Sequence, residues 1–455
     1  MLGLSDSRRH DAPAVQPLRS TIAQAPTLAQ LSLAVGPLAC VRALHLIAYG
    51  LAARAQRPGA WPPCPCCGRS LRRKGVAPRP LPSLFGPLRW RRRVGRCPHG
   101  GDIPQVAPCD ETLGGQPPQR TSGALQCLGW ARAGFVPFAT AARWLGGSGG
   151  DVVSPRAVWC WGPAAGCQAM EPLQEALGAV ARGYEPTPEP LTAAQVALPL
   201  ALGAEGVMMP CRSEGGQAQG KLRWRELKVG VLARLGQHRT RTGQVVTRRV
   251  QRRLVAGLGD MDALTPRLWL AALRQGIRSA PQVVWRRDGG RGVGRLDAEC
   301  FAGHARGILD LYHAAQQLGR GAAAWLDGRT PQARRWFGWA RHRLRHGMPD
   351  GGRADLTEAR DVEGLPETAR EPWRIVYTYL SRHREHINYD MDTDVGLPLG
   401  SGMVESACKW LIQQRFKGGG RRGSEAGFNH LVHLRLAGGN RRFETLFGLA
   451  LSPNS

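Results

Sequence analysis

The sequence predicts an α/β protein in which the first strands are antiparallel, and three observations support this class. Short apolar or alternating runs, typical of strands, are scattered over residues 196–309. Segments with helical spacing lie before, between and after them. Apolar residues make up 42% of the 455 residues, which is enough for sizeable cores and too many for a disordered chain.

The predicted strands are short, and several end beside glycine. An apolar run at Val196–Leu202 is followed by Val207–Met209, and Trp224–Leu235 alternates at Glu226–Val231. Two later strands are expected at Gln282–Trp285 and Gly307–Leu309. Helical spacing predicts helices at 31–53, 119–184, 264–277, 313–386 and 400–415. This order of elements fits a ribonuclease-H-like core.

The net charge indicates a polyanionic partner. Lys and Arg number 62 against 34 Asp and Glu, which gives +28, and a nucleic-acid backbone is the commonest counterpart of such a surplus. The densest run interleaves arginines with an indole, which suits phosphate contact and stacking; the alternative is a solvated face. The residues expected to contact DNA here are Arg72, Arg73, Lys74, Arg89, Trp90, Arg91, Arg92 and Arg93.

Cysteine use indicates a reducing compartment. Twelve cysteines in a long chain without a recognisable signal peptide favour free thiols and a cytoplasmic location. Since no run of about 18 apolar residues occurs, no membrane span and no membrane partner are expected.

Cys64 and Cys67 form a knuckle of the kind that presents two ligands to zinc. A ribbon-type site needs a second pair, and here only Cys97 and His99 are available, at a spacing that strains the geometry. The alternatives are a structural Zn²⁺ held by these four residues and a cysteine-bearing remnant without metal.

A helix, a Gly-rich turn and a second helix follow. Phe138–Leu145 and Ser154–Trp161 flank the glycines, and Ser154 is placed to cap the second helix ahead of Pro155. The pattern predicts either a helix-turn-helix that binds DNA, with Arg156 in contact, or a plain helical hairpin.

Three acids stand where strands or helices meet glycine or serine: Glu205, Asp288 and Glu405. Two Mg²⁺ (or Mn²⁺) ions close together need carboxylates from separate elements, and acids at strand ends beside glycine are accessible to phosphate. We therefore expect these three residues to be catalytic and to hold the metal.

The stretch Leu399–Lys409 (LGSGMVESACK) with Gln414–Gly418 resembles the bacterial DDE transposases of the ISKra-type insertion sequences, which are distantly similar to Mutator-like transposases. Trp224–Val231, Asp288-Gly289 and Ile308–Ala314 add to the likeness, which runs from about residue 60 to 447.

The resemblance implies a ribonuclease-H-like domain interrupted by a helical insertion, with Asp288 and Glu405 as the second and third acids of a catalytic triad. It implies that Asp310 and His313 form a signature close to the insertion, with an organising role. It further implies binding to terminal inverted repeats and target DNA, homo-oligomers on paired ends, a bacterial, nucleoid-associated location, and DNA contacts by Lys409, Arg415 and Lys417 after the third acid.

The resemblance and the composition together predict seven regions. They are an N-terminal helical segment at 1–60, a zinc-ribbon-like unit at 61–115, a helix-turn-helix region at 116–184, a linker at 185–195, the first part of the core at 196–312, the helical insertion at 313–398 and the second part of the core at 399–455.

One position departs from the family pattern. The first acid is expected to be Asp, and the Glu at position 205 places the carboxylate one methylene further from the backbone. A displacement of 1 Å can lower the catalytic rate by roughly 10²-fold. Glycines such as Gly439 also stand where bulkier residues are expected. Two functions therefore follow: a transposase that cleaves and joins DNA strands, or a catalytically impaired copy that only binds DNA.

Overall fold

A computed structural model of the chain describes residues 15–56, 61–100, 106–113, 120–146, 153–212, 222–287, 296, 300–346, 366–418 and 423–448. The chain forms two compact units, one made of residues 1–163 with 447–455 and the other of residues 164–446. The boundary between the two units lies between Pro163 and Ala164, within the helix Pro155–Ala181.

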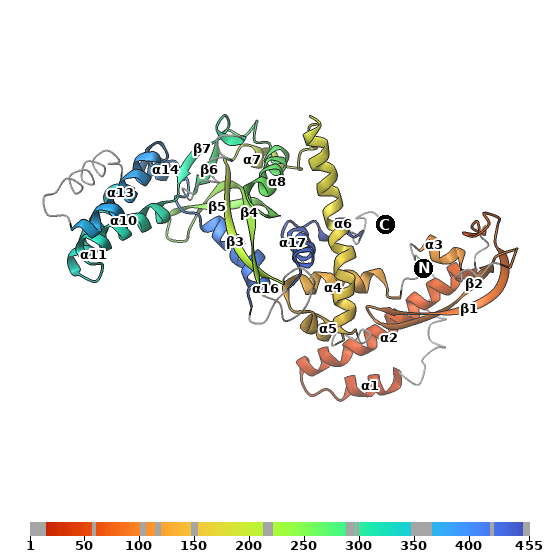
Figure 1. Ribbon diagram of the computed structural model, residues 1–455. Coiled ribbons are helices and arrows are strands. Elements are labelled where there is room, and N and C mark those ends of the chain that lie inside the picture. The colour runs from red at the N-terminus through yellow and green to blue at the C-terminus, as the bar shows by residue number, and fades with distance from the viewer. Residues whose placement is uncertain are drawn as a thin grey trace. The chain divides into compact units, whose positions relative to one another are not determined.

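The first unit begins with two helices, α1 (Val15–Ala23) and α2 (Leu28–Gln56), followed by a hairpin of β1 (Arg72–Ser83) and β2 (Gly86–Arg96). In Figure 1 these elements run from red to orange. One side of α2 packs on Leu88 and Trp90 of β2. Leu28–Ala55 of α2 is long and apolar enough to cross a membrane by length and composition alone, with a hydropathy of 1.7. On that criterion, the expectation that no such segment exists is wrong.

Three helices complete the first unit after the short α3 (Pro108–Thr112). They are α4 (Gly123–Phe135), α5 (Phe138–Gly146) and the start of α6 (Pro155–Ala181). Leu125, Leu145 and Val158 join them in one core. The hydroxyl of Ser154 accepts the N–H of Ala157 at 3.1 Å, which is the N-cap predicted for the second helix. The turn at 147–152 lies outside the described residues.

The second unit contains a mixed five-stranded sheet of order β5-β4-β3-β6-β7. The central strand β3 (Leu200–Cys211) pairs antiparallel with β4 (Arg223–Arg239), which pairs antiparallel with β5 (Val245–Leu258). On its other side β3 is parallel to β6 (Val283–Arg287), and β6 is parallel to β7 (Arg306–Leu309).

The observed strands differ from the predicted ones in two ways. The runs 196–202 and 207–209 belong to one continuous strand, β3, so that Glu205 lies within a strand and not at its end. The third strand is β5, which was not predicted, because its arginines at 248, 249, 252 and 253 obscure the alternation of apolar residues.

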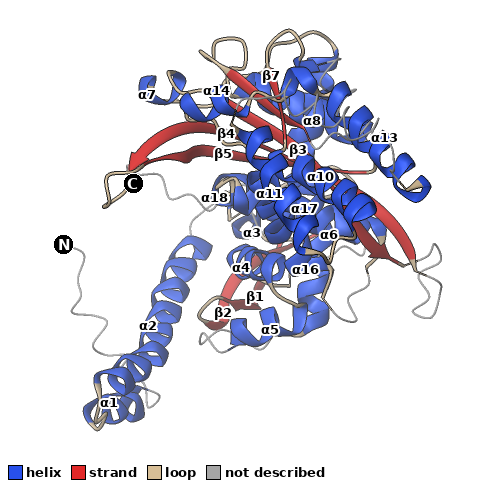
Figure 2. Cartoon of the chain, turned by 90° about the vertical axis from the view of Figure 1, so that its left-hand side faces the viewer, coloured by secondary structure: helices blue, strands red, loops and turns tan. Residues whose placement is uncertain are grey.

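Helices cover both faces of this sheet (Figure 2). Leu200, Leu202 and Ala204 form one core with α8 (Met261–Arg274). Ala201 and Val207, on the opposite face of β3, form the other core with the helices near the C-terminus. Those are α15 (Gly402–Cys408), a π-helical turn at Lys409–Gln413, α16 (Gln414–Phe416) and α17 (Glu425–Gly439). A short α7 (Ala193–Val196) leads into β3, and α18 (Phe443–Leu446) follows α17.

A helical group follows β7 and makes up the region predicted as an insertion. It consists of α10 (Leu311–Leu326), α11 (Pro331–Arg345), α13 (Glu367–Arg382) and α14 (Tyr389–Asp394). Three indoles meet edge to face at its centre: the Trp336 and Trp373 rings are 5.2 Å apart, and the Trp325 and Trp373 rings are 5.8 Å apart. Such pairs stabilise a core beyond their buried area.

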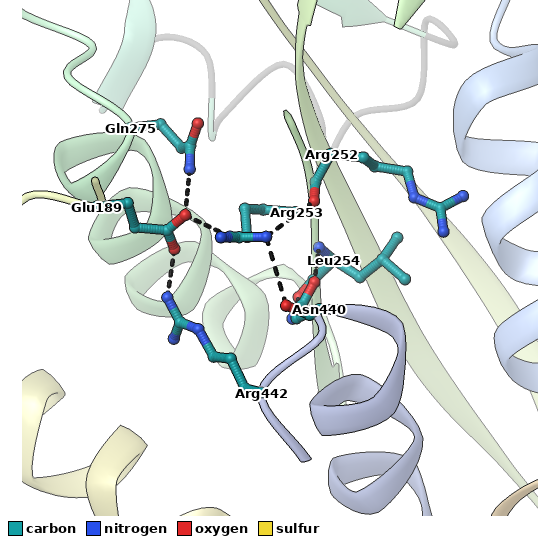
Figure 3. Close-up of polar contacts among 7 residues, drawn as sticks. All are labelled: Glu189, Arg252, Arg253, Leu254, Gln275, Asn440 and Arg442. Atoms are coloured by element: carbon teal, nitrogen blue, oxygen red, sulfur yellow. Dashed lines mark hydrogen bonds and ion pairs between the residues drawn. The ribbon is translucent and has the colours of Figure 1, made fainter. Parts of the chain in front are cut away.

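The segment expected to be a linker is fixed to the second unit by Glu189 (Figure 3). This carboxylate, 7% exposed, accepts from Arg253 of β5, from Arg442 beyond α17, and from Gln275 after α8 at 2.6 Å. Beside it the amide of Asn440 pairs with both backbone groups of Leu254, each at 2.9 Å. The Glu189 hydrogen bonds therefore join three elements that are far apart in sequence.

Candidate active site and metal-binding cluster

The structure brings Glu205 and Glu405 to the same face of the sheet. Side chains alternate along a strand, so Glu205 shares its face of β3 with Ala201 and Val207, the face that packs against α15. Burial raises the pKa of the Cys408 thiol to about 12, and the charges of Glu205 and Glu405 add to this shift, whereas that of Lys417 opposes it. An acid from the first strand and an acid from a late helix therefore both act on one thiol of the core.

Gly203 allows α15 to lie this close to the sheet. A Cβ at Gly203 would come within 2.7 Å of Cγ2 of Val404, the residue before Glu405. Gly400 has a similar role, since its Cβ would meet the ring of Tyr312 at 2.5 Å. The glycines of the Gly-Ser-Gly-x-Val-Glu stretch and of the first strand therefore set the distance between the two acids through packing.

Asp310 fixes the start of α15. Its Oδ1 caps α10 by accepting the N–H of His313 at 2.8 Å, and its Oδ2 accepts the N–H of Ser401, the N-cap residue of α15. Nδ1 of His313 lies 3.1 Å from Oδ1. Burial alone would raise the pKa of Asp310, but the hydrogen bonds from His313 and Ser401 hold it at about 2.

The hydroxyl of Ser401 donates to Oε1 of Glu405 at 2.7 Å. A chain of hydrogen bonds therefore runs from Asp310 through Ser401 to the third acid. Asp310 is only 1% exposed, so its hydrogen bonds are structural. The organising role that the resemblance implies stays a prediction.

Arg286 orders the same region from β6. Its guanidinium donates to the carbonyls of Pro398 and Gly400, just before α15. Burial lowers its pKa to about 10, although Asp310 and Asp392 oppose the shift. β6 is parallel to β3, with Arg286 opposite Gly203, and ends at Arg287. The predicted second acid, Asp288, is the next residue in the sequence and lies outside the described residues.

Both acids offer the type of ligand that the predicted metal site needs. Their side chains are half-buried, and carboxylate oxygens are ligands of the kind that Mg²⁺ prefers.

The helix that carries Glu405 continues into a π turn. Such a turn leaves backbone carbonyls poorly paired, and Arg435 of α17 donates from Nε to the carbonyl of Leu411 at 2.7 Å and from its terminal nitrogen to that of Trp410. The guanidinium also lies 5.0 Å from the ring of Trp410. Gly439 is needed here, because its Cβ would meet Trp410 at 2.9 Å; this glycine is therefore no sign of a weakened copy.

Cys64, Cys67 and Cys97 form a cluster that could hold a metal ion such as zinc. Their sulfur atoms lie within 4.8 Å of one another, and the Cys67 and Cys97 sulfurs are 3.8 Å apart. The knuckle has the expected local geometry: the N–H of Cys66 donates to the Cys64 sulfur at 3.4 Å, and Gly68 has φ +68°. His99 is exposed and is not among the clustered ligands, so among the described residues three of the four predicted ligands come together.

The hairpin divides the predicted basic run between two faces. Arg89 and Arg91 are exposed, whereas Trp90 is 7% exposed and packs under α2. Arg92 is buried, and together with Arg79 it pairs with Asp110. The burial of Trp90 and Arg92 contradicts the expectation that they contact DNA, because alternate residues of a strand point inward. The remaining predicted residues of the hairpin, Arg72, Arg73, Lys74 and the half-buried Arg93, lie toward the surface.

The other predicted basic residues are also divided. Arg156 is exposed at the start of α6, and Lys409 and Lys417 are exposed after Glu405. Arg415 is 6% exposed, with its guanidinium 5.9 Å from the ring of Phe416, so its role in packing replaces the expected DNA contact.

Comparisons with known proteins give a distant likeness among solved structures. No family model and no curated protein match the chain. Among solved structures the chain is similar to the Drosophila P element transposase strand transfer complex, with 8% sequence identity and a TM-score of 0.27, over 75% of this chain and 84% of that chain.

Proposed function

We propose that the chain is a DDE-type transposase of an insertion sequence, which binds terminal inverted repeats and cleaves and joins DNA strands. The observation that carries this proposal is that Glu205 lies on the face of β3 against which α15, the helix that bears Glu405, packs. The sheet supports it: three antiparallel strands followed by two that are parallel to the first is the arrangement of a ribonuclease-H-like core.

In this proposal Glu205, Glu405 and Asp288 would hold Mg²⁺, which when bound would supply Lewis-acid stabilisation of charge on phosphate oxygens. The rest of the chemistry described here belongs to the chain itself. Asp310 fixes the backbone of Ser401, and Ser401 holds the Glu405 carboxylate in one rotamer. Arg286 fixes residues 398–400, so the third acid is placed before substrate binds.

The first unit would recognise the DNA ends. The cysteine cluster would bind Zn²⁺ and stiffen the base of the hairpin, and α5 with the start of α6 would form the helix-turn-helix. Binding of paired ends would require a homo-oligomer. The protein would act in the cytoplasm, at the nucleoid.

A metal-dependent nicking assay tests the proposal. With Mg²⁺ or Mn²⁺, the full chain should nick a supercoiled plasmid that carries the element's ends, and Glu205→Gln and Glu405→Gln should each lower the rate by at least about 10²-fold. Glu385→Gln, an exposed carboxylate away from the site, is the matched control. Full nicking by both site variants, with folding verified by thermal melts, would show that these acids are not catalytic.

The second candidate is a DNA-binding protein without catalysis, and the longer side chain at Glu205 favours it. In that case end binding persists without cleavage. Glu205→Asp separates the two functions: a gain of cleavage indicates an impaired enzyme, and binding with no cleavage in either form indicates a binding protein.

A further inference from the structure

The helix α11, in the helical group after β7, has one apolar face and one cationic face. Its apolar face is buried in the group: Ala333 and Leu344 are buried, and Trp336 contacts Trp325 and Trp373. On the other side the exposed residues are Arg334, Arg335, Trp339, Arg341, His342, Arg345 and His346. None of the predicted DNA contacts lies on this helix.

The cationic face is held rigidly. Thr330 caps α11 by accepting the N–H of Ala333 at 3.1 Å, and Pro331 occupies the first helical position. At 1.5 Å per residue, Arg334 and Arg345 lie about 16 Å apart along the axis. This span covers several phosphates of a nucleic-acid strand.

The composition of α11 does not fit an ordinary solvated helix. It contains five arginines and no acid, and Arg341 and Arg345 stand at i and i+4, where like charges oppose helix formation. Among the described residues, no carboxylate is paired with the four exposed arginines. Such an arrangement is disfavoured in the free protein and becomes favourable against a polyanion.

Trp339 adds a planar surface to this face. Its side chain is 42% exposed, and the guanidinium of Arg343 lies 4.9 Å from the ring centroid, which supports one side of the indole. An exposed indole flanked by phosphate-binding groups is the combination that holds single-stranded nucleic acid, because every base offers a π-face.

We propose that the exposed face of α11 binds single-stranded DNA, with Arg334, Arg335, Arg341 and Arg345 on phosphates of one strand and Trp339 stacked on a base. The choice of DNA over other polyanions rests on the proposed function. This face would hold a strand that has left its duplex, whereas the first unit binds intact ends.

Salt-dependent binding of a fluorescent oligo(dT) 20-mer and of a 20-base-pair duplex tests the proposal. Binding is measured on the full-length Glu405→Gln variant in EDTA, so a negative cleavage assay leaves this readout unaffected. Changing the four arginines to Gln should reduce the slope of log K against log salt by about 3 on the 20-mer, since each phosphate contact contributes about 0.7. Changing them to Lys should keep the slope.

Trp339→Ala should weaken binding of the 20-mer about 5- to 100-fold and leave the duplex unaffected, and Trp339→Phe should lie between wild type and Ala. The matched charge control is Arg241→Gln with Arg248→Gln and Arg249→Gln, exposed residues of β5 and the turn before it, which should leave the slope on the 20-mer unchanged.

Three results would overturn the proposal. One is an unchanged slope in the four-Gln variant, which would show that this face contacts no phosphates. Another is a salt slope that falls as much per removed charge in the Arg241, Arg248 and Arg249 control as in the four-Gln variant. The third is a Trp339→Ala variant that binds the 20-mer as tightly as wild type. In that case no base stacks on Trp339, and α11 contributes only positive charge.

Discussion

Ser401 and Glu405, one helical turn apart, are joined by a hydrogen bond of 2.7 Å, and the backbone of Ser401 is itself held by the buried Asp310. The third candidate acid therefore depends on a carboxylate that comes 95 residues earlier in the chain. Asp310 and Glu405 belong to elements that meet only in the folded state. The geometry of the candidate site therefore depends on the stability of the second unit.

Asp310 should stabilise the protein in a pH-dependent way. Its folded pKa of about 2 lies below the usual value, so the stabilisation is fully present above about pH 4 and is lost as the pH falls toward 2. Asp310→Asn should lower the free energy of unfolding by about 2 kcal/mol at pH 7, with a smaller deficit at pH 3, measured by urea titration. Asp390→Asn, on exposed α14, should have no such effect; an equal and pH-independent loss in Asp310→Asn would show that charge is not involved.

Gly203→Ala should damage both packing and catalysis. The added Cβ would lie 2.7 Å from Val404, so we expect a loss of about 1–3 kcal/mol in unfolding free energy and slower DNA nicking, because α15 must shift. Val404→Ala in the same chain should restore part of both. Gly236→Ala on β4, where the nearest atom is 3.7 Å away, is the control. If the double variant is no better than Gly203→Ala, the contact with Val404 is not the cause.

Glu189→Gln should destabilise the second unit. The change leaves Arg253, whose side chain is 17% exposed, without its counter-charge, and breaking a buried pair costs about 3 kcal/mol. Glu185→Gln in the same segment is the comparison, because its pair with Arg278 is exposed and should contribute under about 1 kcal/mol. Chemical denaturation measures both, and equal effects would mean that the Glu189 contacts are no stronger than a surface pair.

The cysteine cluster should contain zinc when the protein is purified under reducing conditions. We expect about one Zn²⁺ per chain by elemental analysis, and its loss in Cys64→Ser together with a lower melting temperature. Cys66→Ser changes an exposed thiol in the same knuckle and should keep the metal. A metal-free wild type with an unchanged melting temperature in Cys64→Ser would identify the cluster as a remnant.

The sequence predicted the parts of the fold that depend on local chemistry. The Ser154 cap, the strand at Trp224–Leu235 and the knuckle at Cys64–Cys67 follow from neighbouring residues, and the structure shows all three. The half-buried alternation expected for that strand holds only at 226–229, because both of its faces are buried from Val229 to Leu235. It did not predict β5, since arginines at half-exposed positions resemble a surface charge run. Nor could it show that Trp90 faces α2, because strand register decides which alternate residues point inward.

The sequence predicted which residue types the candidate site contains, but not the hydrogen bonds that connect them. The stretch around Glu405 marked the helix, whereas the roles of Asp310 and Arg286 depend on contacts with residues about 90 to 114 positions away. The expected position of Glu205 at a strand end was wrong, because Gly203 and Gly206 look like the end of a strand although β3 continues to Cys211. In the structure Gly203 serves instead as the contact surface for α15.

The π turn at Lys409–Gln413 has a consequence for helical phase. A π turn holds one residue more than the α-helix around it, and one residue corresponds to about 100° of rotation. The extra residue therefore sets the angle between the side that bears Glu405 and the side that buries Phe416. A single deletion in this turn would keep every acid in the sequence and still place Glu405 and Phe416 out of phase.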